Sequence, residues 1–119
     1  MKKILIVDDA KFMRLTLKNI VESSGKFHVI GEASNGKEAI DKYLELKPDV
    51  VTMDVTMPIM EGLEAVEIIK KLDPKANILM VSAMGQKKIV MDSIQAGAKG
   101  FLVKPFQQDK VINELEKIS

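Results

Sequence analysis

The chain has 119 residues, enough for one domain with its own hydrophobic core and too few for two domains of usual size. It contains no cysteine, which excludes a disulfide scaffold and any metal site built on thiolates. Its 18 basic and 17 acidic residues give a net charge of only +1, which provides no strong attraction for nucleic acid or a membrane surface. We therefore expect a single domain over residues 1–119 that binds neither.

No segment has the length of a targeting or membrane-spanning sequence. The apolar run at the N-terminus ends at Asp8, and the longest stretch without an ionisable side chain covers only residues 76–86. A signal peptide needs about 7–15 apolar residues and a membrane helix about 20. These lengths favour a cytoplasmic protein.

Short apolar runs alternate with longer segments of helical periodicity along the whole chain. The runs predict strands at residues 3–7, 28–33, 49–53, 76–81 and 100–103, and their continuous apolar character indicates strands covered on both faces. Asn35 followed by Glu38 predicts the start of the second helix. Residues 87–96 have the weakest helical pattern, with Val90 and Ile94 as the expected anchors.

Five such strand–helix units predict an α/β fold with right-handed crossovers. We expect a flavodoxin-like three-layer sandwich, in which helices cover both faces of a parallel five-stranded sheet of order 2-1-3-4-5.

Charged and polar side chains stand at the ends of four predicted strands. Asp8 and Asp9 follow the first strand, Asp54 the third, Ser82 the fourth and Lys104 the fifth. Because parallel strands end at one edge of their sheet, where such folds bind ligands, we expect these five side chains to converge.

Each of these residues also has an ordinary structural explanation. Asp8 or Asp9 could cap the first helix, Asp54 could begin a turn, Ser82 could cap the fourth helix, and Lys104 could be a solvated surface residue. Independent caps and surface charges do not explain why opposite charges meet at one edge, so we favour a functional site.

The charges at this edge indicate a divalent cation. Three carboxylates and one ammonium group sum to about −2 in a small volume, which a cation would relieve. The ligands available at this edge are oxygens, because cysteine is absent and the single histidine, His28, lies on another strand. Oxygen ligands favour Mg²⁺, with Mn²⁺ as the alternative. Such ions are commonly completed by phosphoryl oxygens, and Asp54 is placed to attack phosphorus and form an acyl phosphate.

The whole chain resembles the receiver domains of response regulators in four motifs and one glycine, which are Ile6-Val7-Asp8-Asp9, Met53-Asp54-Val55-Thr56-Met57-Pro58, Gly62, Ser82-Ala83 and Lys104-Pro105-Phe106. The strand order given above is in part what this resemblance implies. The resemblance also implies that Asp54 accepts a phosphoryl group from a histidine kinase. Asp9, Asp54 and the backbone carbonyl of Thr56 would bind Mg²⁺ directly, and Asp8 would act largely through water.

The same resemblance assigns roles to three residues in or directly after the last two strands. Lys104 would contact the phosphoryl group, and the Lys104–Pro105 peptide bond is expected to be cis. Ser82 and Phe101 would form a switch pair, in which the hydroxyl moves to the phosphoryl group and the ring turns inward. Ser82 stands where threonine is frequent in the family, and Phe101 stands where tyrosine is common.

Residues 82–86 are most similar to the receivers of flagellar chemotaxis. This similarity implies the kinase CheA as phosphoryl donor and the flagellar motor switch protein as target, with a dedicated phosphatase as a further candidate partner. The target would bind the fourth helix, fifth strand and fifth helix around Met91, Gln95, Phe101 and Lys104. Because the chain ends with the fifth predicted helix, we expect no effector domain and an output by surface contact. We also expect a monomer. A stand-alone receiver in another phosphorelay is the alternative.

Two other classes of protein fit the sequence less well. A phosphatase with an aspartate nucleophile usually has a second aspartate two residues later, where this chain has Thr56. A flavin-binding module needs a phosphate loop after the first strand, where Asp8 and Asp9 would repel phosphate. We therefore expect a regulatory phosphoacceptor rather than an enzyme, one that assists only its own phosphorylation and dephosphorylation.

Overall fold

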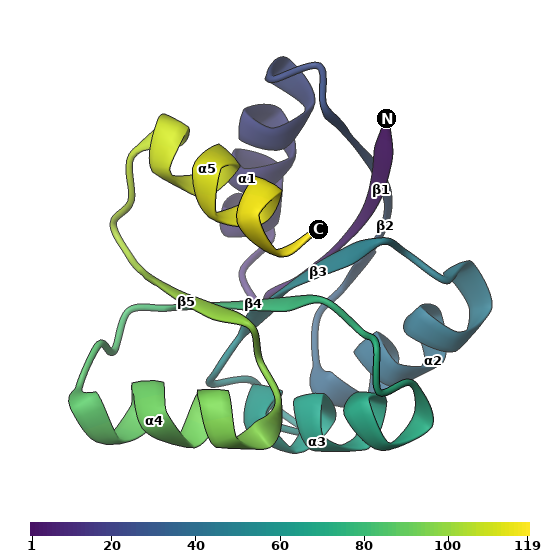
Figure 1. Ribbon diagram of the computed structural model, residues 1–119, viewed down its shortest axis with the longest axis vertical. Helices are drawn as coiled ribbons and strands as arrows, with labels where there is room; N and C mark the ends of the chain where they lie inside the picture. Colours follow the sequence, from purple (N-terminus) through teal and green to yellow (C-terminus); the bar gives the residue numbers. More distant parts are fainter.

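The computed structural model describes residues 1–119, in which five strands and five helices alternate (Figure 1). None of the helices has both the length and the apolar character needed to cross a membrane. The elements are β1 (Lys2–Val7), α1 (Lys11–Ser23), β2 (Phe27–Ala33), α2 (Gly36–Leu46), β3 (Val50–Asp54), α3 (Gly62–Leu72), β4 (Ile78–Ser82), α4 (Lys87–Ala96), β5 (Gly100–Val103) and α5 (Gln108–Ile118).

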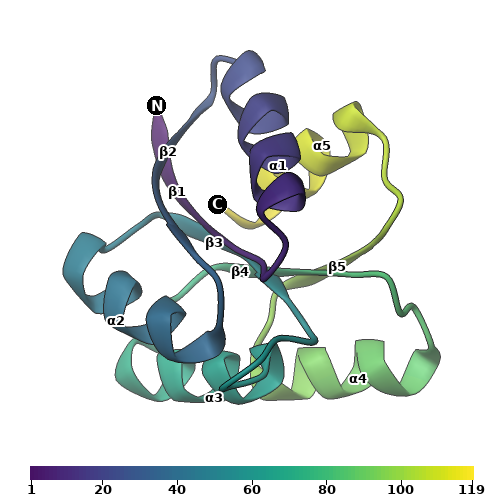
Figure 2. The same cartoon turned by 180° about the vertical axis from the view of Figure 1, so that it is seen from behind.

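The strands form one parallel sheet of order β2-β1-β3-β4-β5. Helices α1 and α5 cover one face, and α2, α3 and α4 cover the other, as the two opposite views show (Figures 1 and 2). The predicted three-layer sandwich and its strand order are confirmed. The chain leaves β1 for β2 on one side and returns to β3 on the other, so a crevice is expected at the carboxyl ends of β1 and β3.

Alternate residues of β1 belong to two separate hydrophobic cores. Leu5 and Val7 pack in the core under α2 and α3, whereas Ile4 and Ile6 pack in the core under α1 and α5. All four side chains are at most 1% exposed, and burial of each contributes roughly 1.5–3 kcal/mol. The strand that leads into Asp8 is therefore held firmly from both faces.

Two details differ from the sequence prediction. Asp54 and Ser82 are the last residues of β3 and β4 rather than the first residues after them. Helix α4 forms as expected, but Ile94 is 48% exposed and does not anchor it. The buried position is Ser93, whose hydroxyl donates to the carbonyl of Ile89 at 2.8 Å. Because the buried face of α4 carries the polar Ser93, the helical spacing of apolar residues in the sequence does not mark that face.

The predicted start of α2 is confirmed. The Asn35 side chain accepts a hydrogen bond from the amide of Glu38 at 2.9 Å, and the Glu38 carboxylate accepts one from the amide of Ser34 at 2.8 Å. The first contact satisfies an amide that the first turn of α2 leaves free, and the second ties the residue before the N-cap to that turn.

Candidate functional site

The sheet register brings the predicted polar residues to one edge. Val7, the last residue of β1, pairs with Met53, so Asp8 and Asp9 lie beside Asp54 at the end of β3. Asp54 pairs with Val81 in turn, which puts Ser82 at the end of the neighbouring strand. The convergence expected from the strand ends is therefore present in the fold.

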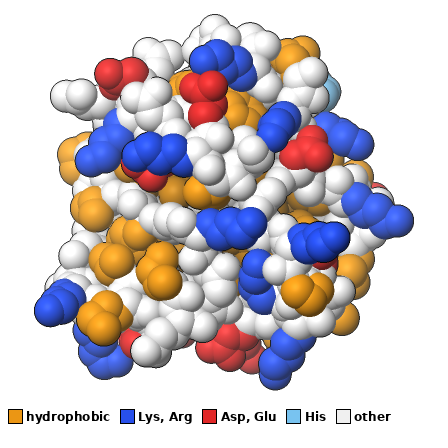
Figure 3. Space-filling view, viewed as in Figure 1, with side chains coloured by type: hydrophobic (Ala, Val, Ile, Leu, Met, Phe, Trp, Pro, Cys, Tyr) orange, Lys and Arg blue, Asp and Glu red, His pale blue; other side chains and the backbone are white.

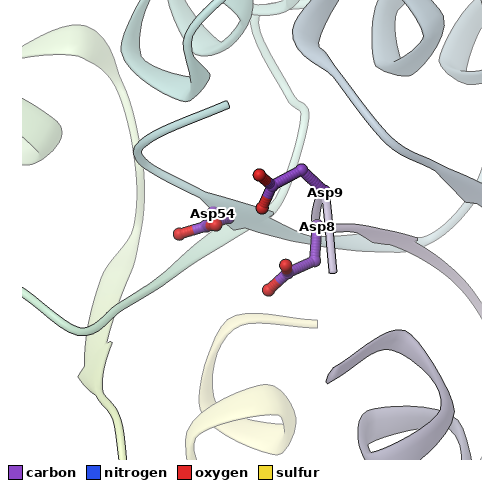
Figure 4. Close-up of side chains that lie close together, drawn as sticks. All are labelled: Asp8, Asp9 and Asp54. Atoms are coloured by element: carbon purple, nitrogen blue, oxygen red, sulfur yellow. The ribbon is translucent and has the colours of Figure 1, made fainter. Parts of the chain in front are cut away.

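Three carboxylates form the centre of the site. One oxygen from each of Asp8, Asp9 and Asp54 lies within 4.8 Å of the others, and Figure 4 shows the three side chains close together at the ends of β1 and β3. Asp8 and Asp54 are buried and Asp9 is exposed. A cluster of hard oxygen ligands with one open side fits a small divalent cation such as Mg²⁺.

Lys104 supplies the positive charge of the site. Its Nζ donates to Oδ2 of Asp8 at 2.9 Å and lies 3.7 Å from Oδ1 of Asp54. The Lys104 side chain is only 16% exposed, so it is not a solvated surface lysine. The peptide bond from Lys104 to Pro105 is cis, as the resemblance implied. One ammonium group cannot balance three carboxylates, so the site keeps an excess of negative charge.

This excess acts on the ionisation of Asp54. Burial raises the pKa of the Asp54 carboxyl from its ordinary value of 3.8 to about 6. Lys104 opposes this rise, whereas the neighbouring Asp8 and Asp9 add to it. The ionised carboxylate is therefore under-stabilised, and a further cation beside it would favour the charged form.

The ordinary explanations for Asp8 and Ser82 do not hold in the structure. Asp8 Oδ1 accepts from the amide of Ala10 at 2.9 Å, yet Ala10 is the residue before α1 and no side chain caps that helix. Ser82 Oγ accepts from the amide of Met84 at 3.0 Å and lies well before α4, whose N-terminus also lacks a side-chain cap.

Phe101 and Thr56 lie outside the carboxylate cluster. Phe101 is half-buried in β5 and packs against the core under α2 and α3, and Thr56 is exposed in the loop after β3. The roles that the resemblance gave them, as switch ring and as carbonyl ligand, stay predictions.

Gly62 lets α3 begin directly against the end of β3. Its amide donates to the carbonyl of Val55 at 2.8 Å, and a Cβ at position 62 would lie 1.9 Å from the carbonyl oxygen of Asp54. Any side chain there would displace the backbone that carries Asp54.

The sequence reasoning missed Arg14. Its side chain reaches from α1 to the backbone carbonyl of Asp8 at 2.7 Å and to the carboxylate of Glu32 at 3.0 Å. In the sequence, Arg14 is one basic residue of an amphipathic helix, and nothing there distinguishes it from Lys11 or Lys18.

Comparisons with known proteins agree with this geometry. Residues 4–116 match the response regulator receiver domain. The chain is 56% identical to the chemotaxis protein CheY of Thermotoga maritima, over 99% of this chain and 98% of that protein. It is 58% identical to the CheY of Listeria monocytogenes, over 98% of each. A chain in the crystal structure of the CheX–CheY–BeF3–Mg²⁺ complex from Borrelia burgdorferi superposes with a TM-score of 0.95, at 38% identity, over 98% of this chain and 88% of that one.

Proposed function

The chain belongs to the response regulator receiver family, and we propose that it accepts a phosphoryl group from a histidine kinase on Asp54 and then changes its affinity for a downstream partner. The observation that carries this proposal is the buried Asp54 carboxylate with Lys104 on one side and Asp8 and Asp9 on the other. No other part of the fold gathers these groups at the ends of adjacent strands.

The residues of the site fit the steps of the transfer. An Asp54 oxygen forms the new bond to phosphorus while the bond from phosphorus to the donor nitrogen breaks, leaving the donor with its electron pair. Lys104, already within 3.7 Å of Asp54, would neutralise charge on the transferred oxygens. Asp8, Asp9, Asp54 and the carbonyl of Thr56 would hold Mg²⁺, which supplies charge neutralisation and orientation at the phosphoryl group.

Phosphorylation would then act on Ser82 and Phe101. The Ser82 hydroxyl accepts from the Met84 amide, so its own proton is free to be donated to a phosphoryl oxygen on the adjacent Asp54. Phe101 would turn further into the core against which it already packs. Together the two movements would change the surface formed by α4 and β5.

The partners we propose are CheA as phosphoryl donor and the flagellar motor switch protein as target. Hydrophobic side chains gather where Figure 1 draws α4 and β5, at the lower left of the space-filling view (Figure 3). The exposed apolar residues of this region include Met91, Ile94 and Val103, beside the predicted contacts Gln95 and Lys104. A dedicated phosphatase would be a third partner.

Incubation with acetyl phosphate and Mg²⁺ tests the phosphoacceptor. We expect the intact mass to rise by one phosphoryl group that is stable in acid and labile in base. The Asp54→Asn variant should gain none, whereas the control Asp49→Asn, altered at the opposite end of β3, should react like the parent chain. Phosphate on any other residue would overturn the assignment. Rapid turnover of many phosphorylated substrates would instead indicate a phosphatase.

The choice of target is tested separately. We expect the motor switch protein to be retained by the phosphorylated chain and not by the Asp54→Asn variant. Retention that is equal with and without phosphorylation would contradict a role in the motor response and favour another phosphorelay.

A further inference from the structure

Arg14 of α1 joins the ends of two strands behind the acidic cluster. Its Nη1 donates to the carbonyl oxygen of Asp8 at 2.7 Å, and its Nε donates to Oε1 of Glu32 in β2 at 3.0 Å. The Arg14 side chain is only 17% exposed, whereas its Glu32 partner is 40% exposed, so the guanidinium is largely buried and the carboxylate that anchors it lies nearer the surface. The guanidinium therefore links the end of β1 to β2.

The carbonyl that Arg14 holds belongs to the peptide unit between Asp8 and Asp9. Because a peptide unit is planar, holding its oxygen also fixes the direction in which the backbone of Asp9 departs. Asp8 has further restraints, including the bonds of its side chain to Lys104 and to the Ala10 amide. The Asp9 side chain is exposed and makes no hydrogen bond or ion pair, so only its backbone positions it.

We propose that Arg14 is a positioning residue for divalent-cation binding, which acts on Asp9 through the Asp8–Asp9 peptide unit and is itself anchored by Glu32. This inference rests on the proposed function, since it requires that the cluster binds Mg²⁺. The fork of an arginine suits the task because it donates in two fixed directions at once, which a lysine ammonium does not. Outer-shell contacts of this kind commonly change metal affinity by about 10–100-fold.

Charge alone predicts the opposite result. A positive group near the cluster repels a second cation, so neutralising Arg14 would strengthen Mg²⁺ binding if the guanidinium acted only through its charge. Loss of positioning would weaken Mg²⁺ binding instead. The sign of the change therefore separates the two explanations.

Titration of the full chain with Mg²⁺, followed by calorimetry and by backbone amide NMR, tests the proposal. We expect Arg14→Met to weaken Mg²⁺ binding about tenfold and to move the Asp9 amide resonance before Mg²⁺ is added. Arg14→Lys should restore part of the affinity. The control Lys11→Met removes the same charge from the first turn of α1, at an exposed residue without an ion pair, and should leave Mg²⁺ binding unchanged or slightly stronger.

A charge-neutral variant sharpens the experiment. Arg14→Met combined with Glu32→Gln keeps the net charge of the chain and should still weaken Mg²⁺ binding. If Arg14→Met does not fold, Arg14→Lys provides the test, because it keeps the positive charge and loses the fixed pair of donors; weaker Mg²⁺ binding than in the parent chain is expected, whereas charge alone predicts no change.

Two outcomes would overturn the inference in distinguishable ways. Unchanged or tighter Mg²⁺ binding in the folded Arg14→Met variant, beside normal binding by the parent chain, would overturn only the role of Arg14. Absence of Mg²⁺ binding in the parent chain would overturn the proposed function together with it.

Discussion

The two ends of the sheet carry similar side chains and use them in opposite ways. At the amino ends of the strands, polar groups are matched with partners. Asp49 Oδ2 accepts from the amide of Lys3 at 2.7 Å, and the Asp49 carbonyl accepts from the side chain of Asn77 at 3.1 Å. At the carboxyl ends, Asp8 and Asp54 share the single ammonium group of Lys104, and the nearby Asp9 side chain makes no ion pair.

Two aspartates show what this difference does. Asp73, near the amino end of β4, accepts from the hydroxyl of Tyr43 at 2.6 Å and from the amide of Lys75, and these bonds hold its pKa below the ordinary value. Burial raises the pKa of Asp54 at the opposite end of the sheet. An ionised aspartate therefore stabilises the fold where hydrogen-bond donors contact it, as at Asp73, and destabilises the fold where it is buried with too few of them, as at Asp54.

Removal of Lys104 should have the largest effect. Lys104→Met leaves Asp8 and Asp54 without a cation, and breaking a buried ion pair costs about 3–5 kcal/mol. In metal-free buffer we expect the free energy of unfolding, measured with urea and circular dichroism, to fall by about 3 kcal/mol. The control Lys99→Met, at the amino end of β5, should lose less than about 1 kcal/mol, because Lys99 is exposed and its partner, the Asn77 side chain, is neutral. Equal losses would contradict the contrast between the two ends.

Asp54→Asn should change stability in the other direction. Since the folded pKa of Asp54 is raised, its protonated form favours the fold, and that stability is full below pH 3.8 and lost as the pH rises through about 6. At pH 7 the ionised carboxylate therefore destabilises the metal-free protein. We expect the variant to be more stable by about 2 kcal/mol at pH 7 and equal to the parent in acid. Urea unfolding at several pH values measures this, and a gain independent of pH would contradict it.

Tyr43→Phe tests the end of the sheet at which the strands begin, where the polar groups have partners. Asp73 loses its hydroxyl donor, so its pKa should return toward the ordinary value. A lowered carboxyl pKa contributes stability above the unfolded value of 3.8 and loses it as the pH falls through the folded value. We expect a loss of about 1 kcal/mol at pH 7 that disappears in acid, measured by urea unfolding. Phosphorylation of Asp54 should be unaffected; impaired phosphorylation would show that the two ends are coupled.

The smallest effect is expected at Ile59, in the loop after β3. This β-branched residue is 80% exposed and has a φ of 68°, a left-handed conformation that strains it. Ile59→Asn should raise the free energy of unfolding by about 0.5 kcal/mol in calorimetry. Lys47, with a φ of 49° at the end of α2, is unbranched, so Lys47→Asn should gain less. A larger gain at Lys47 would reverse the expected order.

The sheet and its polar edge could be predicted because apolar runs in the sequence mark the strands, and the polar residues that follow the runs mark the strand ends. Apolar runs stop at Asp8 and before Lys104, and the parallel arrangement of the strands brings such ends together. The bond network of Arg14 could not be predicted, since only the folded chain places Glu32 of β2 and the Asp8 carbonyl around one guanidinium.

Two other features could not be predicted from the sequence, the buried face of α4 and the backbone conformation of Ile59. The phase of α4 was misjudged because Ser93, a polar residue, occupies the buried position while the apolar Ile94 faces solvent. The left-handed backbone of Ile59 gives no sequence signal, because that conformation is usually marked by glycine or asparagine.

The contact between Gly62 and the Asp54 carbonyl limits how this chain can evolve. Even the smallest replacement would push α3 away from the strand that ends at Asp54, so we expect glycine to be retained at position 62. Gly25, which has open space around it, is constrained only by its backbone angle. A descendant of this chain with another residue at position 62 should therefore hold the end of β3, and Asp54 with it, in a different place.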